Sequence, residues 1–152
     1  MKAVAARVSS ASVSLRDGAH CGDRRSIGPG LLILLGVDLA DDEAAVKKLV
    51  DKILVLRIFP NDEGKLDQSV VDVRGEMLLI SQFTLCASLK GGRRPDFTSA
   101  AAAQEARALY ERFAALLREA GLEVKTGEFG AKMAVESVND GPVTLWLDTD
   151  LF

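Results

Sequence analysis

The chain has 152 residues, of which 48% are hydrophobic and 27% charged, and its formal net charge is −3. This length suits one domain with a substantial core, so residues 1–152 are expected to form a single domain. The slight negative charge excludes an extended grip on a nucleic acid duplex, which needs many cations against phosphates. No apolar run approaches the roughly 20 residues of a membrane span. The two cysteines and the lack of a signal peptide favour the cytoplasm.

The first half of the chain alternates apolar runs with turns. An acidic first turn, Asp41 to Glu43, predicts a helix because apolar residues follow it at helical spacing, at positions 46, 49, 50 and 53. Two short strands, one buried strand and one turn are predicted at 2–8, 11–15, 30–37 and 61–64.

The second half begins with a buried strand, 76–83, that ends in polar residues. A long helix follows, with Thr98 or Ser99 as its expected N-cap and Gly121 as its stop. One face of this helix carries the apolar residues Leu109, Phe113, Leu116, Leu117 and Ala120, and the last three strands are predicted near 122–126, 133–138 and 143–149.

Strand-rich halves around two helices indicate the α+β class. The chain shows no linker, no low-complexity tract and no internal repeat.

Few residues offer conventional catalytic chemistry. The single histidine, His20, lies in a glycine-containing loop beside Cys21, where a solvated role is the commoner one. One histidine and two cysteines without ligand spacing predict no metal site. Gly28-Pro29-Gly30 opens a strand and lacks the downstream lysine of a phosphate loop. We therefore expect neither a metal nor a cofactor.

Thr84 is the remaining candidate nucleophile, and three interpretations of it stay open. Its hydroxyl needs a base to take its proton, and the sequence places none nearby. Thr84 could instead pack or hydrogen-bond at the strand end. The third interpretation, which we prefer, uses the backbone N–H groups of Phe83 and Thr84 as an oxyanion hole.

Two segments stand out. Ser81-Gln82-Phe83-Thr84-Leu85 closes an apolar strand, and Val138 to Thr144 places a Gly-Pro pair between two strand-like runs. Glycine allows close backbone approach, and proline fixes φ and removes a donor. Together with further matching segments along nearly the whole chain, this pair resembles the signature of the D-aminoacyl-tRNA deacylases. The further segments include 7–8, 11–13, 30–37, 57–59, 64–65, 94–97, 109–110 and 126–133.

Two stretches depart from that family's pattern. Residues 19–26 look longer than the family's hairpin, which affects loop contacts. Asp67 stands where the family usually has asparagine, which affects a local turn.

The resemblance implies a layered, barrel-like sheet with two main helices on one side. It also implies a hydrolase without a cofactor that cleaves the ester between a D-amino acid and the 3′ end of tRNA, and glycyl-tRNA as a further substrate. The resemblance further implies a homodimer, in which the Gly-Pro loop of each chain enters the partner's site with a cis Gly141-Pro142 bond. Gly28-Pro29 would be an ordinary trans turn. The implied catalytic residues are Ser81, Gln82, Phe83 and Thr84, and the implied substrate-binding residues are Gly141, Pro142, Arg7, Phe129, Met133 and Asn139.

The resemblance assigns roles that each have an ordinary structural alternative. Phe129 and Met133 would hold the terminal adenine, since stacking and soft contacts suit a base. Arg7 would brace the Gly-Pro loop. Ser81 and Gln82 would hold the aminoacyl group. The structural alternatives are strand-end hydrogen bonding for Ser81 and Gln82, a core position for Phe129 and Met133, and a surface position for Arg7.

Recognition of the tRNA end alone fits the acidic chain, and neither a membrane nor DNA is an expected partner. Lys90, Arg93 and Arg94 would form a small basic patch there, or simply a solvated loop. The runner-up function is a non-catalytic binding module for nucleic-acid ends or nucleotides.

Overall fold

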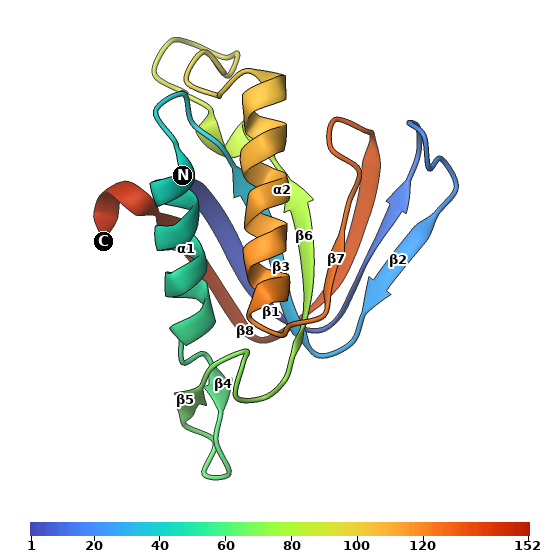
Figure 1. The fold of residues 1–152 in the computed structure, drawn as a ribbon, viewed down its shortest axis with the longest axis vertical. Coiled ribbons are helices and arrows are strands. Elements are labelled where there is room, and N and C mark those ends of the chain that lie inside the picture. The colour runs from blue at the N-terminus through green and yellow to red at the C-terminus, as the bar shows by residue number, and fades with distance from the viewer.

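The structure, a computed structural model, describes residues 1–152 and contains a six-stranded mixed sheet with two helices against one face (Figure 1). The predicted α+β class and the barrel-like sheet are confirmed. No helix has the length and apolar character that crossing a membrane requires. The elements are β1 (Lys2–Leu15), β2 (Arg24–Ile27), β3 (Gly30–Gly36), α1 (Glu43–Val55), β4 (Phe59–Pro60), β5 (Leu66–Gln68), β6 (Glu76–Ser81), a 3-10 helix η1 (Phe83–Cys86), α2 (Ala103–Glu119), β7 (Val124–Thr126), β8 (Met133–Asp148) and a 3-10 helix η2 (Thr149–Leu151).

Strand β1 organises the sheet. Its first half pairs with β3 and its second half with β2, while β8 runs antiparallel along its other side. The sequence predicted two strands here, at 2–8 and 11–15. That prediction was wrong about the break, because Ser9 and Ser10 continue the extended backbone as exposed residues within one strand.

Strands β3, β6 and β7 are parallel neighbours. Parallel strands need crossover connections, and α1 and α2 lie in these connections and cover the same face (Figure 1). Both helices bury their apolar stripes against that face, in a core that includes Leu49, Ile53, Phe113 and Leu117. The prediction of two main helices on one side is therefore confirmed.

The opposite face curls around a second apolar cluster, which includes Val13, Ile27, Leu78 and Ile80. Strands β2 and β7 approach each other across this cluster without backbone pairing. Side chains join them instead, since Arg25 donates to Thr126 O at 2.7 Å and Lys125 to Ser26 O at 2.7 Å. These contacts bring the sheet close to a barrel.

The ends of the helices test the capping predictions. Helix α1 begins as expected, because the side chain of Asp42 caps it by accepting from Ala45 N at 2.9 Å. Helix α2 begins later than predicted, at Ala103. Thr98 bonds to the carboxylate of Asp96, and Ser99 donates to Cys86 O, so neither caps the helix.

Helix α2 ends as predicted, with Gly121 at φ +84°. Its predicted apolar face is confirmed in part. Phe113 and Leu117 are fully buried and Leu109 and Leu116 partly so, whereas Ala120 lies exposed just beyond the helix.

Strand β8 differs most from expectation. The sequence predicted two strands, at 133–138 and 143–149, and the structure has one strand of 16 residues. The register explains why the Gly-Pro pair does not end it. Ala6 pairs with Thr144 and Val8 with Asn139, so one residue of β1, Arg7, opposes the four residues from Asp140 to Val143. The segment 139–144 therefore forms a long bulge on an edge strand, with four residues opposite one, and we call it the Gly-Pro bulge.

Candidate active site

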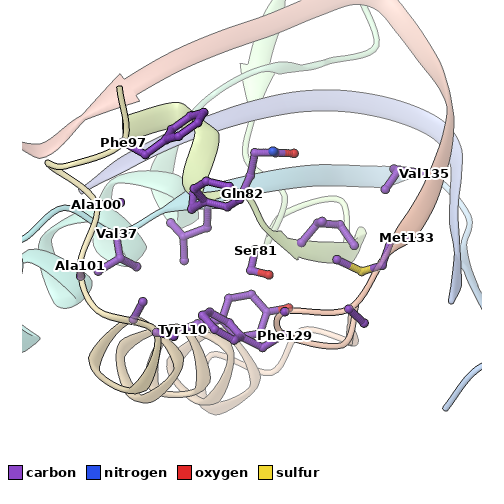
Figure 2. A pocket seen from close by; sticks show the side chains of 17 residues that line it. Val37, Ser81, Gln82, Phe97, Ala100, Ala101, Tyr110, Phe129, Met133 and Val135 are labelled. Atoms are coloured by element: carbon purple, nitrogen blue, oxygen red, sulfur yellow. The ribbon is translucent and has the colours of Figure 1, made fainter. Parts of the chain in front are cut away.

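A cavity of about 530 Å³ opens where β6 ends, between η1 and the N-terminal half of α2 (Figure 2). We call it the main cavity. Three of the four residues predicted as catalytic line it, together with both residues predicted to hold the adenine. Its lining residues are Leu35, Val37, Ile80, Ser81, Gln82, Phe83, Phe97, Ala100, Ala101, Ala103, Ala106, Tyr110, Phe129, Gly130, Ala131, Met133 and Val135.

The end of β6 is fixed by its neighbour β3. Gln82 N donates to Leu35 O at 2.7 Å, and the chain then turns into η1. Gly36 makes this turn possible, since a Cβ there would lie 2.9 Å from Leu85 Cβ and 3.1 Å from Gln82 O. The first amides of a helical turn have no intrahelical acceptor. In η1, these are the N–H groups of Phe83, which lines the cavity, and of the next residue, Thr84, which does not line it.

The polar side chains at this strand end point in different directions. The Ser81 hydroxyl faces the cavity, whereas the Gln82 amide extends away from it (Figure 2). Gln82 donates to the hydroxyl of Thr84, which is exposed and does not line the cavity. Phe83 packs edge-on against Phe97, with ring centroids 5.0 Å apart.

The far wall of the cavity is aromatic and sulfur-containing. Tyr110 and Phe129 lie 5.8 Å apart between ring centroids, and Met133 closes the side. Met133 fits because residue 127 is glycine, where a Cβ would meet its Sδ at 2.5 Å. The Tyr110 hydroxyl donates to Leu79 O at 2.8 Å, and burial raises the pKa of this phenol well above its ordinary value. Tyr110 therefore stays protonated at neutral pH.

The lining contains no Asp, Glu, His, Lys or Arg. A general base must lie within hydrogen-bond reach of the proton that it takes. With Tyr110 held as a protonated donor, the main cavity offers no such side chain. A reaction here would have to rely on backbone dipoles, shape and groups carried by the substrate.

The Gly-Pro bulge is anchored to the body of the protein by Arg7, which is only 7% exposed. Its guanidinium donates to Asp140 O at 3.1 Å and to Ile58 O at 2.7 Å. The Gly141-Pro142 bond is cis and Gly28-Pro29 is trans, so both of these predictions are confirmed.

Asn139 joins the two ends of the bulge. Its Oδ1 accepts from Val143 N at 3.1 Å, and its Nδ2 donates to Thr144 Oγ1 at 2.6 Å. Gly141 and Pro142 do not line the main cavity of their own chain.

Other side chains singled out in the sequence lie elsewhere. His20 is exposed in the loop before β2, 3.7 Å from a carboxylate oxygen of Asp23. No group of three or more His, Cys, Asp or Glu residues is arranged to hold a metal ion. Lys90, Arg93 and Arg94 are exposed and have no carboxylate within 4 Å.

The two departures from the family pattern also have visible roles. The loop before β2 packs on Glu128, whose carboxylate accepts from Ala19 N at 2.8 Å and His20 N at 3.1 Å. Asp67 pairs with Arg57, and its backbone oxygen accepts from Arg57 Nε at 2.8 Å.

Sequence reasoning missed part of the cavity wall. Residues 109–110 match the family pattern without an assigned role, yet Tyr110 lines the cavity and contacts Phe129. Phe97 and the alanines of residues 100–106 were also missed. Small residues at 100, 101, 103 and 106 leave the space that the cavity occupies, and a run of alanines ahead of a helix was the available signal.

Known proteins resemble this chain over nearly its whole length. The sequence profile of D-Tyr-tRNA(Tyr) deacylase matches residues 4–148. A "D-aminoacyl-tRNA deacylase" of Ruegeria sp. (strain TM1040) is 53% identical over 150 residues, which cover 99% of this chain and 94% of the relative.

Solved structures agree with this match. A "c-Myc DNA Unwinding Element Binding Protein" is 40% identical with a TM-score of 0.88, covering 97% of this chain and 98% of its own. A "probable eukaryotic D-amino acid tRNA deacylase", 19% identical with a TM-score of 0.79, covers 96% of this chain and 97% of its own and shares the fold. By the profile and the 53% identity, the chain belongs to the D-aminoacyl-tRNA deacylase family.

Proposed function

We propose that this protein hydrolyses the ester of D-aminoacyl-tRNA and releases the free D-amino acid and tRNA. Family membership supports the activity. The observation that carries the proposal is the main cavity, which is apolar, free of charged side chains and bordered by the first amides of η1. Such a site suits an already activated ester, because it stabilises developing charge without supplying a base.

The terminal adenosine would occupy the wall formed by Phe129 and Met133. Both line the cavity opposite the end of β6, and an aromatic ring with a polarisable thioether suits the face of a base. This placement directs the ribose and its ester toward Ser81 and η1. The inward-facing Ser81 hydroxyl would then hold the aminoacyl group, and Gln82 would orient Thr84 at the rim.

Water attacks the ester carbon in this scheme, and the N–H groups of Phe83 and Thr84 stabilise the oxyanion. The C–O bond to the ribose then breaks, the ribose oxygen takes a proton, and the carboxyl group leaves with the amino acid. The neighbouring 2′-hydroxyl of the ribose positions the water, so the substrate provides the polar group that the cavity lacks. Thr84 has no covalent role, which agrees with its exposed side chain.

Selection between D and L substrates would come from a second copy of the chain. Gly141 and Pro142 stand on an edge strand, away from their own cavity, and Val138 and Trp146 of the same strand are 58% and 50% exposed. In a homodimer, the Gly-Pro bulge of each protomer enters the partner's main cavity. Its backbone oxygens block the direction of an L side chain, and glycine passes because it has no side chain.

The tRNA contact would be confined to the aminoacylated 3′ end. The main cavity is neutral, the chain is acidic overall, and the unpaired cations Lys90, Arg93 and Arg94 lie in the loop that leads to the cavity residue Phe97. Because charged tRNA is used by ribosomes, the proposed place of action is the cytoplasm.

Time courses with D-Tyr-tRNA and L-Tyr-tRNA test the proposal. We expect loss of the D ester alone, with Gly-tRNA also cleaved. Equal loss of both Tyr esters would refute the chiral filter. Binding of tRNA without hydrolysis of any ester would favour a binding module, the class to which the name of the 40% identical solved structure assigns that protein.

A further inference from the structure

A second cavity of about 400 Å³ lies behind the aromatic wall of the main cavity. The two cavities share Tyr110 and Phe129, so a ligand that contacts the Phe129 ring in one lies next to the other. Their chemistry differs sharply, because the second cavity is mostly polar and carries three arginines. We call it the arginine cavity, and its lining residues are Ala19, His20, Arg25, Arg107, Tyr110, Glu111, Ala114, Arg118, Thr126, Gly127, Glu128 and Phe129.

The three arginines are held to different degrees. Arg25 donates to Thr126 O at 2.7 Å and Arg118 to Val124 O at 3.1 Å, so both are positioned by the ends of β7. Arg107 is exposed on α2, donates to Phe129 O at a longer 3.3 Å, and holds its guanidinium 5.4 Å from the centre of the Phe129 ring. Neither Arg107 nor Arg118 has a carboxylate within 4 Å.

Two carboxylates, Glu111 and Glu128, line the cavity, and that of Glu128 already accepts hydrogen bonds from the backbone. Glu128 accepts the N–H groups of Ala19 and His20, and these bonds hold the pKa of Glu128 below its ordinary value. Glu111 is exposed and has no ion-pair partner. Arg25 also lies 3.9 Å from the carboxylate of Asp23, so Arg107 and Arg118 are the cavity cations without a carboxylate partner.

We propose that the arginine cavity binds the phosphate that joins the terminal adenosine of the substrate to the preceding nucleotide. The proposal rests on the proposed function, which places the adenine against Phe129. The main cavity has no cation to meet that phosphate, whereas Arg107 stands beside the same ring. Guanidinium groups bind phosphate oxygens with two parallel hydrogen bonds. Arg107 is the main ligand of the phosphate. Arg25 and Arg118 contribute positive electrostatic potential around it.

The test uses three stable substrate analogues in which an amide replaces the ester. The first is 3′-(D-tyrosyl)amino adenosine, the second adds a 5′-linked cytidine through a phosphodiester, and the third replaces that phosphodiester with a neutral methylphosphonate. Dissociation constants are measured by calorimetry on the full chain. We expect the phosphodiester compound to bind about tenfold tighter than the nucleoside, the size of one charge-assisted contact. The methylphosphonate compound should lose that gain.

Variants then assign the effect to Arg107. Arg107→Gln should abolish the gain that the phosphodiester adds over the nucleoside, measured within that variant, and Arg107→Lys should retain part of it. The matched control, Arg112→Gln, removes a cation from the same helix, where Arg112 pairs with Glu43 and Glu119. Arg112→Gln should show the same affinity gain from the phosphodiester as the original chain. Glu111→Gln should tighten the phosphodiester compound, because it removes a repelling carboxylate.

The outcomes separate failure of the proposed phosphate site from failure of the proposed function. If the nucleoside binds but the phosphodiester adds nothing, or if Arg107→Gln behaves like Arg112→Gln, the arginine cavity is not the phosphate site and the proposed function stands. An equal gain from the methylphosphonate would assign the effect to the cytidine base and refute the phosphate. Failure of the nucleoside to bind, with no cleavage of D-Tyr-tRNA, would instead refute the proposed function.

Discussion

Replacing Arg7 with methionine tests how the Gly-Pro bulge is held. Methionine keeps much of the length and apolar volume of the side chain and removes every donor. Two carbonyls lose their partner, Ile58 O at 2.7 Å and Asp140 O at 3.1 Å. The ion pair with the Asp140 carboxylate, at 3.3 Å, adds little because that group is 57% exposed.

The expected cost follows from the burial of each carbonyl. Ile58 is 7% exposed, so its oxygen stays unsatisfied at a cost of about 1–3 kcal/mol. Asp140 is exposed, and its oxygen can bind water, so its loss adds about 1 kcal/mol. Arg7→Met should therefore lower the free energy of unfolding by about 2–4 kcal/mol, measured from urea midpoints at constant slope. Deacylation should also fall in the folded variant, because the bulge loses its anchor.

Arg57→Met is the matched control. Arg57 also donates to a backbone oxygen and pairs with a carboxylate, but it is 64% exposed, so its loss should cost less than about 1 kcal/mol. If the two variants lose the same stability, Arg7 is not a buried anchor. Arg7→Lys keeps the charge but cannot span both carbonyls, so it should fall between Arg7→Met and the original chain.

Three further predictions follow from the same structure. Thr84→Ala and Thr84→Val should each keep most of the deacylase activity, and a drop of about a thousandfold in both would restore a nucleophilic threonine. Phe129→Ala should weaken the aminoacyl-adenosine analogue by ~1–3 kcal/mol through lost stacking, with a smaller loss for Met133→Ala, and unchanged affinities would remove the adenine from this wall. Burial raises the pKa of the Cys86 thiol to about 12, whereas Cys21 is exposed. At pH 8, a thiol reagent should therefore label only Cys21 in the native protein and both cysteines in urea. Labelling of both thiols in the native state would contradict the burial of Cys86.

The sequence predicted those helices and strands whose boundaries depend on neighbouring residues in the chain. Helix α1 needs only its acidic first turn and its apolar spacing, and both are present in 13 consecutive residues. The start of α2 could not be predicted in this way. Ser99 and Thr98 are good capping residues, but other partners use them: the Ser99 hydroxyl donates to Cys86 O, and Thr98 bonds to the nearby carboxylate of Asp96. Farther along, the Ala101 amide donates to Val37 O at 3.0 Å. These contacts keep the chain out of the helix up to Ala102.

The candidate site likewise contains residues that the local sequence predicts and residues that only the fold brings together. The polar residues after β6 are visible in the sequence because a strand end changes from apolar to polar within two positions. The opposite wall comes from α2 and from the segment after β7, so residues more than 20 positions apart in the chain face one another there (Figure 2). Tyr110 shows the difficulty, since its spacing on α2 is that of any core residue.

In the proposed backbone filter, the Gly-Pro bulge would have to be both rigid and exposed. A carbonyl oxygen can reject a side chain only if it cannot move aside, yet a segment that enters a partner must protrude from its own sheet. Asn139 ties the two ends of the bulge, and Arg7 ties its middle to the body. Gly141 completes the arrangement, because at φ +123° a Cβ would lie 2.7 Å from the Arg7 guanidinium. Glycine at 141 therefore allows the buried arginine to reach the backbone that it holds. In the proposed homodimer, these anchors would leave the outer backbone of the bulge free to face the substrate.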